Sequence, residues 1–154
     1  MKKPERTLII IKPDAIQRHL IGEIVTRFEK KGFRLIASKF TQISKETAKK
    51  HYDVHKDKPF YDSVVEYLSS SPSMIMVWES EGIIKMARKM IGRTFGYEAS
   101  AGTIRGDFGS SRGFNLIHAS DAIATAQHEI PLFFKPKELA SYEFADNHWI
   151  QGTE

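Results

Sequence analysis

One histidine, His118, lies in a sequence context that favours nucleophilic or proton-transfer chemistry. His118 lies in the stretch NLIHASDA, residues 115–122, between a short apolar run and a Ser-Asp pair. A neutral imidazole is a competent nucleophile and proton carrier near pH 7. The run 115–117 predicts a strand, and Ser120 and Asp121 favour the N-cap of a helix. The sequence therefore predicts a strand-to-helix turn around His118, although a lone histidine is more often structural.

Three cationic side chains could bind an anionic group, but each has an ordinary explanation. Lys12 ends the aliphatic run 7–11, where a lysine usually extends its charge to solvent. Arg88 borders the apolar stripe of an expected helix, where it could simply cover the core. Arg105 lies in the glycine-rich stretch GTIRGDF, and charged residues in such loops are usually solvated. Taken one by one, these residues indicate no site.

The common nucleotide and zinc signatures are missing from the sequence. It has neither a phosphate loop ending in Lys-Ser/Thr nor the dinucleotide pattern Gly-x-Gly-x-x-Gly. His51 and His55 are four residues apart on one face of an expected helix, but no carboxylate completes a zinc-like spacing. We therefore interpret both histidines as surface residues. Phe60, at helical spacing from Val64, is more often a core residue than a ligand contact.

Composition restricts the class of protein. The chain has 154 residues, which predicts one domain over residues 1–154, and a net charge of +4, which favours anionic partners such as nucleotides or nucleic acid. It contains no cysteine, which excludes disulfides and thiolate catalysis and fits a reducing compartment. No apolar run reaches the length of a membrane span, and no secretory signal is visible. We therefore expect a cytoplasmic protein without a membrane segment.

The spacing of apolar residues predicts the elements that must position these side chains. It predicts strands at 7–11, 34–41, 74–78 and 115–117. It predicts helices at 21–28, 44–55, 59–68, 83–91 and 121–134. The stretch 93–113, which carries five glycines, shows neither period. Four strands separated by helices predict an α/β (α+β) sandwich, with helices on one face of a largely antiparallel sheet.

Several motifs together resemble one family. NLIHASDA resembles the active-site signature of nucleoside diphosphate kinases, Asn-x-x-His-Gly/Ala-Ser-Asp. The resemblance covers residues 5–150 and continues, in the same order, through TLIIIKPDAIQR, HYDVHKDKPFYDSVVEYLSSSP, MVWES, GTIRGDF and NHWI. It implies a ferredoxin-like βαββαβ core with added helices and a long loop. It also implies that the γ-phosphoryl group of ATP passes to a nucleoside diphosphate by a ping-pong mechanism.

The resemblance assigns a role to each matching residue. His118 matches the histidine that becomes phosphorylated, Ser120 and Glu129 match the residues that orient it, and Phe60 matches the aromatic that stacks on the base. The residues that match those holding the phosphates and sugar are Lys12, Tyr52, Arg88, Thr94, Arg105 and Asn115. The implied cofactor is Mg²⁺, bound through the nucleotide's phosphates. The implied partners are nucleoside triphosphates and diphosphates.

The chain departs from the family pattern at a few positions. Ala119 stands where glycine is commoner, and Val64 replaces the usual leucine beside the base with a similar apolar wall. Arg112 stands where an apolar residue is expected, which predicts a guanidinium at the mouth of the base pocket. The segment 93–101 matches the family poorly beyond Thr94.

Two features predict a homo-oligomer. The stretch 93–113 is too long for an idle loop and needs a packing partner, and Trp149 near the terminus offers a large apolar surface. The resemblance predicts a hexamer, as in many relatives, because the tail here is closer to the hexameric type than to that of the tetrameric relatives.

Two other functions compete with the kinase. A ferredoxin-like fold with positive charge suits a nucleic-acid-binding module, but no strand carries the paired aromatics of an RNA-recognition motif. A degenerate family member could serve as an interaction protein, but every matched catalytic position is intact.

Overall fold

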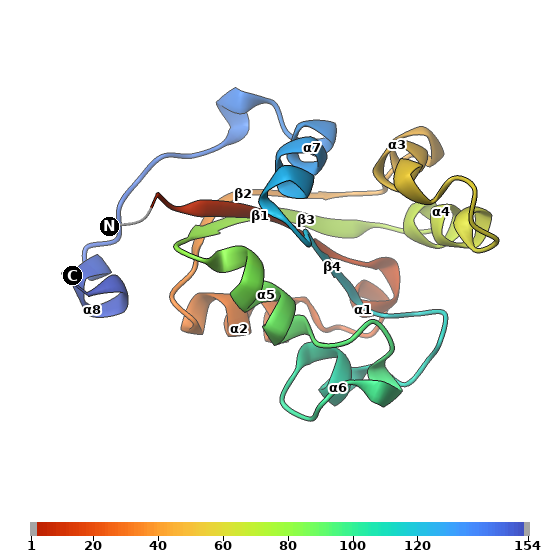
Figure 1. The fold of residues 1–154 in the computed structure, drawn as a ribbon, viewed down its shortest axis with the longest axis horizontal. Coiled ribbons are helices and arrows are strands. Elements are labelled where there is room, and N and C mark those ends of the chain that lie inside the picture. Colours follow the sequence, from red (N-terminus) through yellow and green to blue (C-terminus); the bar gives the residue numbers. More distant parts are fainter. Residues whose placement is uncertain (1–2, 153–154) are drawn as a thin grey trace.

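A four-stranded antiparallel sheet organises the protein, for which a computed structural model describes residues 3–152. The strands lie in the order β2-β3-β1-β4, and every neighbouring pair is antiparallel (Figure 1). Their bounds are β1 (Glu5–Ile11), β2 (Arg34–Thr41), β3 (Ser73–Ser80) and β4 (Ile117–Ala119). This α+β architecture confirms the expected ferredoxin-like fold.

The interior strand β1 pairs with β4, the short edge strand that contains His118. β1 pairs with β3 from Glu5 to Ile11, and its last part pairs with β4, so that Ile10 faces His118 across the ladder. The side chains from Thr7 to Ile11 are all buried. A strand buried on both faces reads as a continuous apolar run, because neither set of alternating side chains reaches water.

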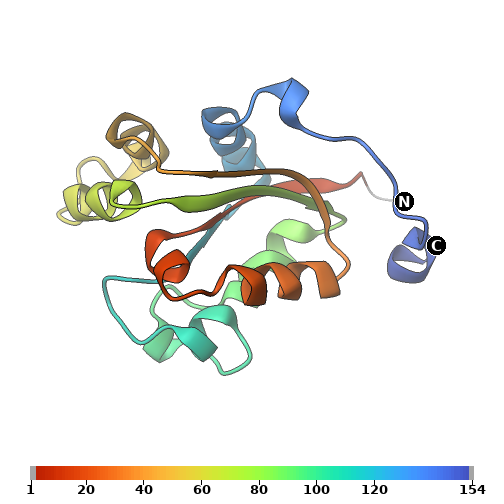
Figure 2. The ribbon, with the colours of Figure 1, turned by 180° about the vertical axis from the view of Figure 1, so that it is seen from behind.

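Helices cover both faces of the sheet, which corrects the expectation of one covered face (Figures 1 and 2). One core packs around Ile9 and Ile11, and the other packs around Leu8 and Ile10. The first contains side chains from α1 (Pro13–Gln17), α2 (Ile21–Lys30), α5 (Ile83–Ile91) and α6 (Ile104–Phe108). The second contains side chains from α3 (Lys45–His51), α4 (Tyr61–Ser69) and α7 (Ile123–Phe133).

Local signals set the start of some helices. Ser44 caps α3 by accepting a hydrogen bond from the backbone N–H of Thr47 at 3.1 Å, as the sequence predicts. The 3₁₀ turn η1 (Asp53–His55) follows α3. Pro59 was expected inside the first turn of α4, but α4 begins at Tyr61 because a turn precedes it, in which Tyr61 N–H donates to Lys58 C=O at 3.1 Å.

The connection without periodicity folds into two very short elements, η2 (Gly96–Glu98) and α6. Helices of this length bury too few residues to leave a repeat in the sequence. Thr103 caps α6 by accepting from Gly106 N–H at 3.0 Å. A Cβ on Gly96 would lie 2.2 Å from the carbonyl oxygen of Gly109, so the close approach of the two backbones requires glycine.

The C-terminal segment returns along the sheet toward the start of β1 (Figure 1). It contains η3 (Pro136–Glu138) and α8 (Asn147–Gln151). Ile150 packs on Gly32, which follows α2 and has a φ of +87°. Trp149, in contrast, is 82% exposed. Within residues 3–152, no helix has both the length and the apolar character needed to cross a membrane.

Candidate functional site

His118 is the middle residue of β4, not part of a turn as expected. The next helix, α7, begins only at Ile123 and has Ala122 at its N-cap. Ser120 does not cap it, because its hydroxyl accepts from the backbone N–H of Leu8 at 3.0 Å and donates to Glu129 at 2.7 Å. The serine that resembles a helix cap in sequence therefore connects β1, β4 and α7.

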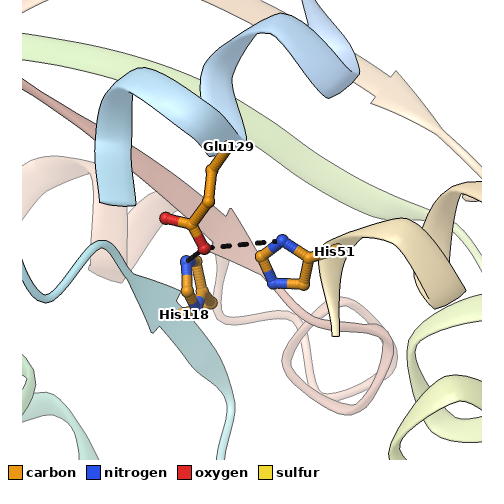
Figure 3. A group of neighbouring side chains, drawn as sticks. All are labelled: His51, His118 and Glu129. Atoms are coloured by element: carbon orange, nitrogen blue, oxygen red, sulfur yellow. Dashed lines mark ion pairs between the residues drawn. The ribbon is translucent and has the colours of Figure 1, made fainter. Parts of the chain in front are cut away.

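Glu129 on α7 holds one side of the His118 ring (Figure 3). Its Oε1 accepts from Ser120, and its Oε2 lies 2.8 Å from Nε2 of His118. Nε2 is shielded from solvent beneath this carboxylate. The nitrogen left for reaction with a ligand is therefore Nδ1, on the other side of the ring.

The surroundings keep the imidazole of His118 uncharged at neutral pH. Burial, followed by the nearby charges of Lys12, Arg105 and Arg88, lowers the pKa of His118 to about 3. Burial also raises the pKa of Glu129, against the opposing influence of His51 and the Ser120 hydroxyl. A neutral imidazole has a free lone pair on one nitrogen, which is the form that can act as a nucleophile.

Lys12 is buried beside the histidine, which corrects its interpretation as a solvated strand-end residue. Its Nζ donates to Oδ1 of Asn115 at 2.8 Å and lies 5.3 Å from the ring centroid of Tyr67. Its backbone N–H donates to Leu116 C=O at 2.8 Å, and α1 begins at the next residue. Burial, and then the charge of Arg105, lowers the pKa of Lys12 to about 7.

Arg105 is also buried, although a residue in a glycine-rich loop was expected to be solvated. Its three guanidinium nitrogens donate to the backbone carbonyls of Asn115 at 3.1 Å, Gly92 at 3.2 Å and Ile117 at 2.6 Å. Burial, and then the charge of Arg88, lowers the pKa of Arg105 to about 10, so it stays cationic at neutral pH. Arg105 thus joins α6 to the segment that carries His118.

The remaining predicted ligand contacts lie around this cluster or at the surface. Arg88 is exposed and donates to Ala119 C=O at 3.2 Å. The hydroxyl of Tyr52 is buried without a hydrogen-bond partner in the described part of the chain, and burial raises its pKa. Phe60 is 46% exposed, so it is not a core residue, and Thr94 is exposed in the connection after α5.

His51 is the residue that the sequence interpretation missed. It is the last residue of α3 and only 7% exposed, whereas we expected a surface position. Its ring meets the ring of His118 edge-on at 4.6 Å, and its Nδ1 lies 3.5 Å from Oε2 of Glu129 (Figure 3). The spacing of three from the buried Ala48 places it on the inner face of α3, which is the signal that could have revealed it.

The same three side chains form the one group of possible metal ligands identified within residues 3–152. The ligand atoms of His51, His118 and Glu129 all lie within 4.8 Å of one another. Arg112, in contrast, is exposed, and its guanidinium lies 5.6 Å from the ring centroid of Tyr97. Contact between Arg112 and a nucleotide base stays a prediction.

Comparison with known proteins identifies the family of this chain. A family model described as nucleoside diphosphate kinase matches residues 5–139. The chain belongs to the nucleoside diphosphate kinase family. Similar family members include the nucleoside diphosphate kinases of Crocosphaera subtropica, 56% identical, and Bacillus cereus, 49% identical. Both matches cover 95% of this chain, and they cover 98% and 99% of the two relatives.

Solved structures of nucleoside diphosphate kinases share the fold. The enzyme of Halobacterium salinarum, described in complex with CDP, aligns with a TM-score of 0.93 at 43% identity over 96% of this chain and 99% of that one. The enzyme of Borrelia burgdorferi aligns with a TM-score of 0.91 at 36% identity over 97% of this chain and 98% of that one. It is described as a transition-state mimic with bound vanadate and ADP.

Proposed function

We propose that Nδ1 of His118 carries the phosphoryl group in this enzyme. As a member of the nucleoside diphosphate kinase family, the chain transfers phosphoryl groups between nucleotides. The observation that carries the assignment is the ring of His118, whose Nε2 lies 2.8 Å from Oε2 of Glu129, while burial and the charges of Lys12 and Arg105 lower its pKa. A nucleophile surrounded by positive charge suits an anionic substrate.

The transfer takes two symmetrical steps. Nδ1 of His118 attacks the γ-phosphorus of a nucleoside triphosphate, a P–N bond forms, and the bond to the β-phosphate oxygen breaks. The nucleoside diphosphate leaves with that electron pair. In the second step, a terminal oxygen of another diphosphate attacks the phosphorus of the phosphohistidine, the P–N bond breaks, and its electron pair returns to Nδ1. Nε2 keeps its proton throughout, and the carboxylate of Glu129 at 2.8 Å stabilises the cationic ring that forms.

The cationic and hydroxyl groups around His118 would hold the phosphates. Arginine can bind phosphate through two parallel hydrogen bonds, and lysine contributes a compact charge. The unpartnered buried hydroxyl of Tyr52 is a donor that a bound phosphate would satisfy. The complete set that we propose for phosphates and sugar is Lys12, Tyr52, Arg88, Thr94, Arg105 and Asn115. The Borrelia relative, described with bound vanadate and ADP, supports nucleotide binding by this fold.

A divalent cation fits this site as part of the nucleotide. Kinases of this family generally need one, and we propose Mg²⁺, which prefers phosphate oxygens and water as ligands. The oxygens of Glu129 already face Ser120, His51 and His118, so this carboxylate is not free to bind the ion. When bound to the phosphates, Mg²⁺ would offset part of their charge.

The base would stack on the exposed ring of Phe60, beside Val64. Stacking on an aromatic ring tolerates every base, so we expect low selectivity among nucleotides. The site offers no support for a nucleic-acid-binding module, because its cations converge on one histidine. Assembly into a hexamer and a cytoplasmic location remain predictions from the sequence.

Labelling of the enzyme tests this function directly. Incubation with Mg²⁺ and ATP labelled at the γ-phosphate should yield a labelled protein, because the first step leaves the phosphoryl group on His118. The label should be lost in acid, survive base, and be released by any nucleoside diphosphate. A label that survives acid, or that a diphosphate does not remove, would exclude the phosphohistidine route.

The pKa of Lys12 predicts that nucleotide binding takes up a proton. Lys12 is only partly protonated near pH 7, and a bound phosphate favours its charged form and raises its pKa. Binding at pH 7 should therefore take up about half a proton at this residue, and affinity should fall as pH rises above 7. Calorimetric titration with Mg-ADP in two buffers of different ionisation enthalpy measures this uptake.

The matched variant for this measurement is Lys12→Arg. Arginine keeps its charge throughout the range, so proton uptake at this position should vanish while the positive charge remains. Equal uptake in the two proteins would show that Lys12 is already fully protonated before the nucleotide binds.

A further inference from the structure

Two buried nitrogens face one carboxylate oxygen beneath the catalytic histidine. Nδ1 of His51 and Nε2 of His118 lie 3.5 Å and 2.8 Å from Oε2 of Glu129 (Figure 3). Neither nitrogen makes a well-aligned hydrogen bond to any group in the described chain. Buried polar atoms without a partner are rare and call for an explanation.

The architecture holds His51 in this position firmly. Its ring packs edge-on against the rings of Tyr52 at 4.8 Å, His118 at 4.6 Å and Phe133 at 5.8 Å. A ring confined by neighbours on several sides keeps its orientation. His51 is thus a fixed group on α3, aimed at a carboxylate on α7 that faces a histidine on β4.

We propose that His51 is a positioning residue whose Nδ1–H donates to Oε2 of Glu129 and thereby holds this carboxylate against Nε2 of His118. The inference rests on the proposed function of His118. It extends that function by one residue, which acts through Glu129 and does not touch the nucleotide.

The physical reason lies in the two oxygens of Glu129. Ser120 donates to Oε1 at 2.7 Å, so a second donor on Oε2 would fix the carboxylate plane. A fixed carboxylate keeps the proton of His118 on Nε2 and leaves the lone pair on Nδ1 for attack. Catalytic hydrogen bonds are often long before the substrate binds, so the 3.5 Å contact is consistent with one that shortens during turnover.

Two donors also oppose the effect of burial on Glu129. Burial raises its pKa, and a protonated carboxyl could no longer accept from both imidazoles. His51 itself is neutral at working pH, because burial, and then the proximity of the His118 imidazole, lowers its pKa to about 3. The titratable or charged groups that influence the three side chains are Lys12, Tyr52, His55, Arg88, Arg105, Asp121 and His128.

A pair of variants separates this role from simple packing. His51→Phe keeps a flat ring but removes the donor, and His51→Asn restores an N–H at the place of Nδ1. In His51→Phe we expect kcat to fall roughly 10- to 100-fold with little change in KM, because a hydrogen bond to a charged group is lost. The acid limb of its kcat profile should also move to higher pH, since Glu129 becomes easier to protonate.

His51→Asn should recover most of the lost kcat, although it fills the space less well. His148→Phe, an exposed position in α8, serves as the matched histidine control and should leave kcat and its pH profile unchanged. Equal loss in the two His51 variants, or an unshifted acid limb in His51→Phe, would reduce His51 to a packing residue and overturn the proposal.

The tautomers of the native protein provide a test without any variant. In ¹⁵N-histidine NMR of the unphosphorylated enzyme, His51 should carry its proton on Nδ1 and His118 on Nε2. A proton on Nε2 of His51 would overturn the proposal even if His118 becomes phosphorylated as expected. Failure of ATP labelling at His118 would instead remove the proposed function, so the two failures are distinguishable.

Discussion

Alanine at position 118 should lower turnover of ATP and dTDP by roughly 10⁴-fold or more, because the variant has no atom to carry the phosphoryl group. Transfer between two nucleotides would then require both to bind at once around a site shaped for one. A coupled assay of ADP production measures the loss. The labelled phosphoenzyme should be undetectable in the same variant.

The fold should survive this change, which makes the activity loss interpretable. The side chain of His118 is 19% exposed, and β4 is held through backbone pairing with β1. His148→Ala, an exposed position in α8, is the control and should change turnover by no more than about twofold. Persistent labelling of His118→Ala, with an intact melting transition, would place the phosphoryl group on another residue.

Sequence reasoning succeeds where the cause of a structure is local. The aliphatic run of β1 and the cap of α3 at Ser44 are visible in a few consecutive residues. The spacing in NLIHASDA brings Asn115, His118 and Ser120 together because all three follow one stretch of backbone around β4. The chemical roles of Asn115 and His118 are implied by the resemblance to the family and stay predictions.

Sequence reasoning fails where the partner is distant along the chain. His51 is buried by contacts with Glu129 and Phe133 on α7, some eighty residues away. Nothing near His51 in the sequence reports that α3 packs on α7. Ser120 was interpreted as a helix cap for the same reason, since its real partners are Leu8 and Glu129. A side chain that favours a helix cap does not form one when a hydrogen bond to a distant residue already engages its hydroxyl.

Arg105 shows the same limit and leads to the second large expected effect. We expect Arg105→Lys to lower the free energy of unfolding by about 2–3 kcal/mol, because lysine cannot reach three carbonyls with one ammonium group. The acceptor on Gly92 is distant in the chain from those on Asn115 and Ile117, and the guanidinium joins the two segments. Denaturant unfolding followed by circular dichroism measures this loss.

Activity should fall together with stability in Arg105→Lys, by roughly 10²-fold in kcat, because two of the three carbonyls belong to Asn115 and Ile117, shortly before His118 in the chain. Arg93→Lys is the matched control, since Arg93 is exposed in the same connection and should change the unfolding free energy by no more than about 0.5 kcal/mol. If Arg105→Lys lost activity but unfolded like the native protein, its three backbone bonds would be dispensable for the fold. Its role would then reduce to the charge and hydrogen bonds that it offers to a bound phosphate.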